Sequence, residues 1–374
     1  MYLKKVLLLQ MLVCFVAACT SNKSVQPVEI IEPENITLVQ SKALDDIRLN
    51  VSLTLFDPGL PDDESDTSPL AQLRRAEAHY LPHVLKETLD ASGHWGAVRL
   101  LPQIDPTAEL QITGTILESN GVELKLQVRA TDTTGRIWLD KIYTDFAMDH
   151  GYTMKLDYLV DPFQDGYNQI ANDLAAAKEQ LARTEIGRLL DTSLLRYGIA
   201  LSPESFSEYL MTNDAGLVEI ARLPHREDPM FNRVKSIRES EYAFTDAVDE
   251  HYEALFHRMG ETYIYWRSYS YELIMGNRNL EGSGSRGNAR AGTFRAMEKV
   301  YKTYRERRMN EDALRELTAS FDDEITPTVI EIEDRVVNLN GSLNSQYAAW
   351  RLLLREIYMT EVGLPVAAPA PDAT

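Results

Sequence analysis

The chain has 374 residues, a formal charge of −19 at pH 7, 44% hydrophobic residues and two cysteines. This length is sufficient for two domains with cores of their own. The strong negative charge argues against binding to nucleic acid or to anionic lipid headgroups. Both cysteines lie within the first 19 residues, so the rest of the chain forms neither a disulfide nor a cysteine-based metal site.

The first residues have the layout of a secretory signal peptide. Lysines at positions 4 and 5 precede an apolar run from Val6 to Val16, and two alanines come directly before Cys19. The apolar run is shorter than the roughly 20 residues that a membrane-spanning helix needs. Residues 16–19, Val-Ala-Ala-Cys, resemble a bacterial lipobox, which implies a signal peptide at 1–18 and lipidation of Cys19. A plain secretory signal or a membrane helix is the alternative.

The resemblance to lipoproteins of double-membrane bacteria also implies a location. Thr20 stands where an aspartate would indicate retention in the inner membrane, so we expect an outer-membrane lipid anchor facing the periplasm. Residues 19–40 predict a lipidated tether, because the stretch from Ser21 to Pro33 is polar, contains proline and lacks apolar periodicity.

Residues 41–185 predict an α/β periplasmic domain. Hydrophobic residues alternate from Ile47 to Leu55, which is typical of a half-buried strand. Helical spacing begins after Ser68-Pro69 and ends near Gly93. Further strands are expected at 97–101, 110–116, 123–130 and 137–146, and a closing helix from Asp161 to about Thr184. The predicted fold class is therefore α+β, with an N-terminal mixed sheet that has helices on one side.

This order of elements behind a lipobox resembles the periplasmic module of transport-auxiliary and curli-secretion-type lipoproteins and the N-terminal domain of TolB. The whole chain also resembles a group of uncharacterised proteobacterial lipoproteins. The residues that carry this second resemblance are Gly96-Ala-Val-Arg99, Asp161-Pro-Phe-Gln164, Tyr167 to Leu174 and Asp228-Pro-Met230. The first resemblance covers roughly residues 40 to 185 and implies an envelope location and a role in assembly, but no catalytic residues.

Residues 186–363 predict a helical domain with long, antiparallel, coiled-coil-like helices. No strand is expected after residue 202. Helical spacing from Met230 to Met275 predicts a helix on the order of 70 Å long. Apolar residues at steps of three or four from Val329 to Ile357 predict its packing partner, since they match about four heptads.

Two flanking segments complete the prediction for this half of the chain. A helix with dense basic charge is expected at 294–320, after a glycine- and serine-rich break at 276–292. Residues 364–374 contain three prolines and predict a disordered tail.

Two motifs match patterns of known sites but lack their context. Gly282 to Gly287 matches the dinucleotide fingerprint, yet a long helix and not a buried strand precedes it, so we interpret it as a loop or hairpin tip. His79 and His83 are spaced as a metal pair, but no glutamate adjoins the first histidine and Pro82 interrupts the helix. No nucleophile elbow is present either. We therefore predict no enzyme activity, no cofactor and no metal.

Aromatic residues are densest between positions 263 and 271. One interpretation buries Trp266 and Tyr263 in a core, and the other makes the cluster a surface for a partner or a glycan. The predicted interaction surface consists of Tyr263, Tyr265, Tyr269, Tyr271 and Trp350.

Together these features predict a non-enzymatic scaffold or adaptor subunit of a cell-envelope complex, anchored to the outer membrane. Its expected partner is an envelope protein or a second copy of the chain, with no role for nucleic acid. The alternative is a lipoprotein that binds peptidoglycan or another polysaccharide, and a periplasmic hydrolase is the third possibility.

Overall fold

The computed structural model describes residues 35–42, 47–60, 69–147, 161–225, 227–282, 328–332, 335–339 and 342–363. The chain divides into two compact units, Met1–Glu34 and Asn35–Thr374, and every described residue belongs to the second. The signal peptide, Cys19, the helix predicted at 294–320 and the tail at 364–374 lie outside the described residues. No helix among those described is long and apolar enough to cross a membrane.

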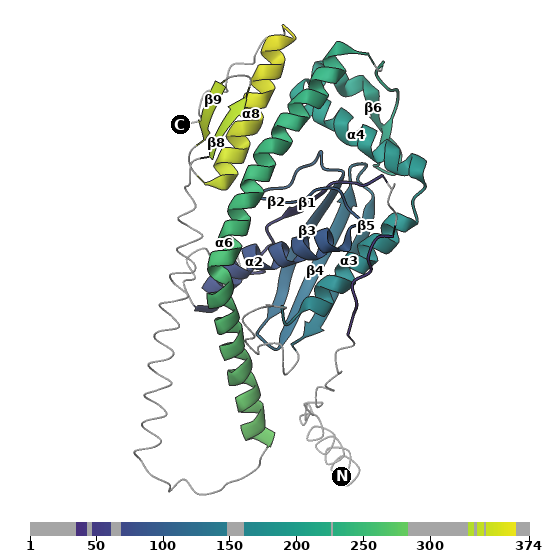
Figure 1. Ribbon diagram of the computed structural model, residues 1–374. Coiled ribbons are helices and arrows are strands. Elements are labelled where there is room, and N and C mark those ends of the chain that lie inside the picture. Colours follow the sequence, from purple (N-terminus) through teal and green to yellow (C-terminus); the bar gives the residue numbers. More distant parts are fainter. Residues whose placement is uncertain are drawn as a thin grey trace, which may run out of the picture. The chain divides into compact units, whose positions relative to one another are not determined.

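A five-stranded mixed sheet lies at the centre of the second unit (Figure 1). Its strands are β1 (Val51–Thr54), β2 (Val98–Leu101), β3 (Leu110–Ser119), β4 (Glu123–Asp132) and β5 (Ile137–Phe146). Their order is β2-β1-β3-β4-β5, in which β1 is parallel to β2 and β3, and β3 to β5 form an antiparallel meander. The α+β class and the mixed sheet are thus confirmed.

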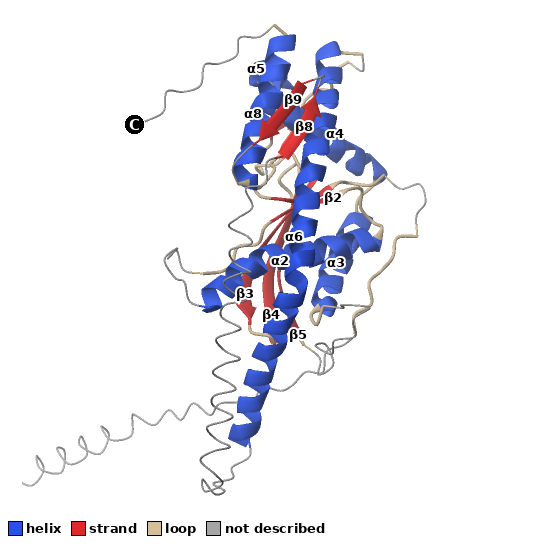
Figure 2. Cartoon of the chain, turned by 60° about the vertical axis from the view of Figure 1, so that its left-hand side comes forward, coloured by secondary structure: helices blue, strands red, loops and turns tan. Residues whose placement is uncertain are grey.

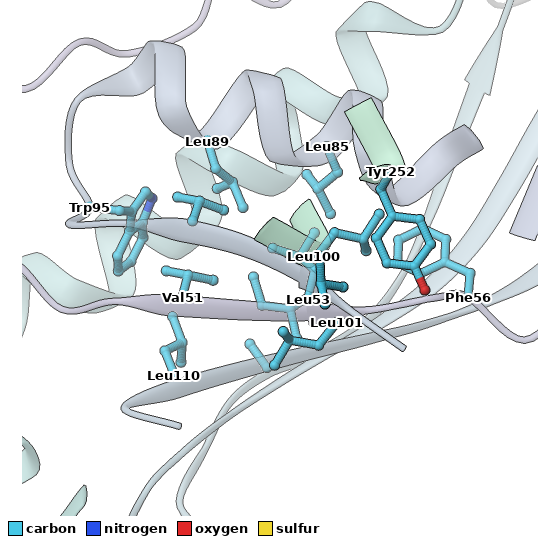
Figure 3. Packing of buried hydrophobic residues seen from close by; sticks show 14 of the residues in the cluster. Val51, Leu53, Phe56, Leu85, Leu89, Trp95, Leu100, Leu101, Leu110 and Tyr252 are labelled. Carbon is cyan, nitrogen blue, oxygen red and sulfur yellow. The ribbon is translucent and has the colours of Figure 1, made fainter. Parts of the chain in front are cut away.

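Helices α2 (Pro69–Ser92) and α3 (Gln164–Glu179) pack on one face of this sheet. Figure 3 shows Leu85 and Leu89 of α2 above the apolar side chains of β1 and β2. Alternate residues of β1, Val51 and Leu53, are fully buried beneath α2, as the alternating pattern predicts. Helix α2 continues through Pro82 without ending there.

The closing helix predicted up to residue 184 is in fact two helices. Helix α3 ends at Glu179, and α4 (Arg183–Leu201) begins where the Ala182 N–H donates to the Glu185 carboxylate. The domain boundary predicted between residues 185 and 186 lies within α4. One hydrophobic core continues from the sheet across this helix into the second half of the chain.

The prediction that no strand follows residue 202 is wrong. After the short helix α5 (Pro203–Phe206), β6 (Leu210–Thr212) and β7 (Val218–Ile220) form a hairpin. Its turn is built by Asn213, whose side-chain oxygen accepts the N–H groups of two later turn residues. Gly216 supplies the positive φ of 79° that the turn requires. Three-residue strands are too short to show alternation in a sequence.

Helix α6 (Pro229–Gly282) confirms the predicted long helix and continues beyond Met275. Its 54 residues correspond to about 80 Å. It packs against α8 (Leu343–Glu361), and Figure 2 shows α8 beside the first part of α6. The two helices are antiparallel, because Arg233 pairs with Glu361 while Phe244 stacks on Trp350 with 5.2 Å between ring centroids.

Only the second half of the helix predicted from Val329 to Ile357 is helical. Its first half forms a hairpin of β8 (Thr328–Ile332) and β9 (Arg335–Leu339), with Ile332 opposite Arg335. The run is rich in β-branched residues, which favour a pleated strand and disfavour a helix. Helix α8 starts only at Ser342, whose side-chain oxygen accepts the Ser345 N–H as an N-cap.

Candidate functional site

The structure separates the residues of the predicted interaction surface. Trp350 and Tyr263 are 0% and 2% exposed and belong to the hydrophobic core, so neither contributes to an exposed surface. This part of the prediction is corrected: both side chains pack α6 against its neighbours. Tyr271 is half-buried, and its backbone lies beside the hairpin tip at Gly121. The side chains of Tyr265 and Tyr269 are not among those described.

The main feature of the unit is a pair of buried sets of charged side chains that contact α6. The first set, which we call the Glu77 network, joins α2, α6 and β3. Glu77 is fully buried and accepts a hydrogen bond from Ser119 at 2.7 Å, and the Arg267 guanidinium lies 3.0 Å from its carboxylate. Arg267 also donates from Nε to the Tyr263 hydroxyl at 2.6 Å. This network fixes the second half of α6 on the sheet.

Burial sets the protonation of the acids around Arg267. Burial raises the pKa of Glu77, and the nearby Arg267 guanidinium only partly opposes this rise. Asp161 also belongs to the Glu77 network, just before α3. Burial raises the pKa of Asp161 to about 6, although the Phe163 N–H bonds to its carboxylate and Arg267 is close. The ionised Asp161 carboxylate therefore lowers the free energy of unfolding at neutral pH.

The Asp161→Asn variant is expected to show this effect directly. A carboxyl group whose pKa is raised in the folded state destabilises the fold progressively as pH rises through 4 to 6, by about 2–3 kcal/mol at most. Asparagine keeps an oxygen for the Phe163 N–H but carries no charge. We expect a higher thermal midpoint than in the unsubstituted protein at about pH 7.5, a smaller gain at about pH 4.5 and no difference at about pH 3, below the ordinary pKa of an aspartate. Equal midpoints at all three pH values would contradict the assignment, and the Asp214→Asn variant, at an exposed position in the β6–β7 turn, is the control.

A second buried set, the Arg238 network, fixes the first half of α6. Arg238 is 6% exposed and contacts Asp105 at 3.2 Å and Glu241 at 3.1 Å. From α8, Arg351 lies 3.6 Å from Asp105 and 3.5 Å from Glu241, so two arginines face two carboxylates. The Arg238 guanidinium also covers the ring of Tyr197 in α4 at 4.6 Å. Four parts of the chain thus meet at one point: helices α4, α6 and α8, and the loop that precedes β3.

The charges of this second network are balanced. Burial alone would raise the pKa of Asp105, but Arg238 and Arg351 outweigh burial and hold the pKa below its usual value. Burial likewise works against the charge of Arg238, while Asp105 and Glu241 raise its pKa well above the usual value. Asp105 and the two arginines are therefore ionised at neutral pH, and the pairing compensates their removal from water.

Between the two networks, α6 closes one edge of the sheet. The N–H of Leu100 in the edge strand β2 donates to Asp249 of α6 at 3.0 Å. Its neighbour Arg99 pairs with Asp246 and lies over the ring of Tyr242. Side chains of a helix here take the place of a further strand, which protects the edge from pairing with another chain.

Sequence reasoning overlooked both networks although a signal was present. Glu77 stands within the apolar stripe of α2, four residues after Leu73, and Arg267 follows Tyr263 by four. Arg238 and Glu241 similarly interrupt the apolar stripe of α6. A charge inside an apolar stripe indicates a buried ion pair, because an unpaired charge there would be too costly.

The described residues bring together no group of three potential metal ligands. His79 bonds to the Arg75 carbonyl within its own helix, and His83 stacks on Phe256 of α6 with 4.0 Å between centroids. Both histidines therefore take part in helix packing. Gly282 is the last residue of α6, and the rest of its glycine motif is outside the described ranges.

Exposed apolar side chains occur on the β6–β7 hairpin, just after it, and near the middle of α8. Met211 on β6 is 51% exposed, Leu223 lies just after β7, and Leu352 on α8 is 62% exposed.

The comparisons with protein families, with curated proteins and with solved structures find no match to the chain. The described unit thus contains a long helix held by two buried ionic networks, with exposed apolar side chains on the β6–β7 hairpin and on α8.

Proposed function

We propose that the protein is a non-enzymatic scaffold or adaptor, held to the outer membrane by a lipid on Cys19 and facing the periplasm. The observation that supports this proposal most is the attachment of α6 by the Glu77 and Arg238 networks. These networks lie 29 positions apart along the helix, from 238 to 267, or about 44 Å. A helix that is fixed at two such distant points keeps a constant distance between them. A spacer in a multiprotein complex needs this property.

An envelope protein that binds the apolar residues Met211, Leu223 and Leu352 is the partner that we favour. The alternative, polysaccharide binding by the tyrosines, has less support because Tyr263 and Trp350 are buried. No arrangement of nucleophile, base and oxyanion donors that would favour the hydrolase is evident in the described part of the chain.

Replacing Cys19 with serine is the direct test of the anchor. Serine cannot be acylated by the lipoprotein pathway, so we expect the variant to move from the membrane fraction to the soluble periplasmic fraction. Fractionation followed by immunoblotting measures this. Persistence in the detergent-free membrane pellet would contradict the lipid anchor, and Cys14→Ser, which leaves the lipobox intact, is the matched control.

Photo-crosslinking in cells tests the scaffold itself. A photoreactive residue at Leu352 or Met211 is expected to capture one or a few proteins, identified by mass spectrometry. The same residue at Ile104, which is exposed on the loop after β2, serves as control. Capture of glycan-linked material alone, or the same capture from all three positions, would contradict the proposal and favour the polysaccharide-binding alternative.

A further inference from the structure

The predicted tether ends in a segment that is docked on the folded unit. Residues 35–42 run in extended form along α3, which Figure 1 shows as a purple segment beside that helix. Ile36 and Leu38 are half-buried, with Leu38 packed against the core, whereas Thr37 and Val39 are exposed. This alternation is that of a strand on a surface.

Side chains of α3 hold this segment by its backbone. Asn172 donates to the Thr37 carbonyl at 3.0 Å and accepts the Val39 N–H at 2.8 Å. One turn earlier, Asn168 donates to the Ile36 carbonyl at 2.7 Å, and Asp165 accepts the Ile36 N–H at 3.1 Å. We call Asp165, Asn168 and Asn172 the α3 ladder.

The α3 ladder imitates the edge of a sheet. Its three positions are spaced by three and four residues, so they lie along one side of the helix. A carboxamide offers one donor group and one acceptor, as a peptide unit does. All four bonds go to main-chain atoms, and a fifth bond joins the Ser41 N–H to the Ser92 carbonyl at the end of α2. The segment is therefore held at both ends.

The contacts of the docked segment show at which end of the sheet it begins. Asp165, which holds Ile36, adjoins Gly166, whose N–H donates to Asp145 of β5. Asp145 pairs with Leu124, and Leu124 follows the β3–β4 hairpin tip. The same tip, at Gly121, abuts residues 267–271 of α6. Residue 35 therefore lies at the hairpin end of the sheet.

The β6–β7 hairpin lies at the other end of the sheet. The Val218 N–H of β7 donates to the carbonyl of Thr134, in the turn between β4 and β5. The two hairpins, and with them Leu117 and Met211, thus mark opposite ends of the unit.

We propose that the α3 ladder is a docking site for the segment 36–41 of its own chain, and that this docking turns the β3–β4 hairpin end toward the membrane. The opposite end, with α4, the β6–β7 hairpin and the exposed Met211, then faces the periplasm. This inference rests on the lipid anchor of the proposed function. It also gives α6 a polarity: the helix runs from the periplasmic side toward the membrane.

Hydrogen–deuterium exchange of the full-length protein tests the docking. We expect the hydrogen-bonded amides of Ile36, Val39 and Ser41 to be protected, and the Asn168→Ala/Asn172→Ala variant to lose this protection at least tenfold, while the thermal midpoint changes little. Asn344→Ala, an exposed asparagine on α8, should change nothing. Unprotected amides in the unsubstituted protein, or full protection in the double variant, would overturn the docking. Protection that disappears on dilution would overturn docking within one chain in favour of exchange between two copies.

Fluorescence quenching on vesicles tests the orientation. The lipidated protein, labelled at Leu117→Cys near the β3–β4 hairpin or at Met211→Cys, is reconstituted in phosphatidylcholine vesicles that contain a lipid-borne quencher. We expect stronger quenching at position 117, and a smaller difference in the Asn168→Ala/Asn172→Ala variant. Equal quenching in the unsubstituted protein would overturn the orientation. Failure of the anchor is recognised separately, because the labelled protein would then not bind the vesicles at all, whereas the exchange experiment needs no membrane.

Discussion

Replacing Arg267 with methionine is expected to lower the free energy of unfolding by about 3–5 kcal/mol, since it removes the nearer of the two arginines beside the buried Glu77 carboxylate and leaves only Arg74, at 3.8 Å. The loss should appear in urea unfolding followed by tryptophan fluorescence. A second substitution, Glu77→Gln, is expected to restore more than half of it. Glutamine still accepts the Ser119 hydroxyl but carries no charge, so the double variant has no buried carboxylate, while Arg74 keeps its hydrogen bond to the Ile116 carbonyl.

The control for this prediction is the same change at an exposed site. Arg222 pairs with Glu208 at 2.7 Å, and both side chains are largely in solvent. Arg222→Met should cost no more than about 0.5 kcal/mol, because exposed ion pairs contribute little. If Arg267→Met were as mild as Arg222→Met, the Glu77 network would not hold α6 in place, and the scaffold proposal would lose its main support.

Truncation of Trp350 to alanine is the second change with a large expected effect. Trp350 is fully buried and stacks on Phe244 of α6, so its removal leaves a large cavity between the two helices. Such substitutions cost about 3–5 kcal/mol. Chemical denaturation of the variant measures this cost. Photo-crosslinking from Met211, at the end where α8 packs, should become weaker or less specific.

Leu352→Ala on the same helix provides the comparison. Leu352 is 62% exposed, so its truncation should leave the free energy of unfolding nearly unchanged. A partner-binding role for Leu352 would show instead as reduced crosslinking in a fully stable protein. Similar losses of stability in the two variants would mean that α8 is not packed on α6 as described.

The parts of the fold that could be predicted are those with a strong periodic pattern. Alternation in β3, β4 and β5 and the long helical spacing of α6 each extend over ten residues or more. The hairpin of β8 and β9 was mistaken for a helix because Val329, Ile332, Val336 and Leu339 also satisfy steps of three and four. Two short strands that pair with each other can give the same apolar spacing as a helix, and only the β-branched residues distinguish them.

The site was harder to predict because it depends on contacts between distant segments. Arg267 and Glu77 are 190 residues apart, and nothing in either neighbourhood identifies the other as partner. The tyrosine cluster fits an interface because Tyr and Trp are common in interfaces, but the same side chains are also large core residues. Tyr263 is buried because Arg267 and Glu77 satisfy its hydroxyl in the interior.

Docking of residues 36–41 on α3 shortens the part of the chain that can act as a tether. In the proposed lipoprotein, only residues 20–34 then separate the lipid from the folded unit, and a chain of this length spans roughly 50 Å when fully extended. A protein confined to so thin a layer meets neighbours in the same membrane at an effective concentration that can reach the order of millimolar. A contact too weak to survive purification could therefore be almost fully occupied in the cell. The surface around Met211 can therefore bind its partner with only a low affinity and still be occupied.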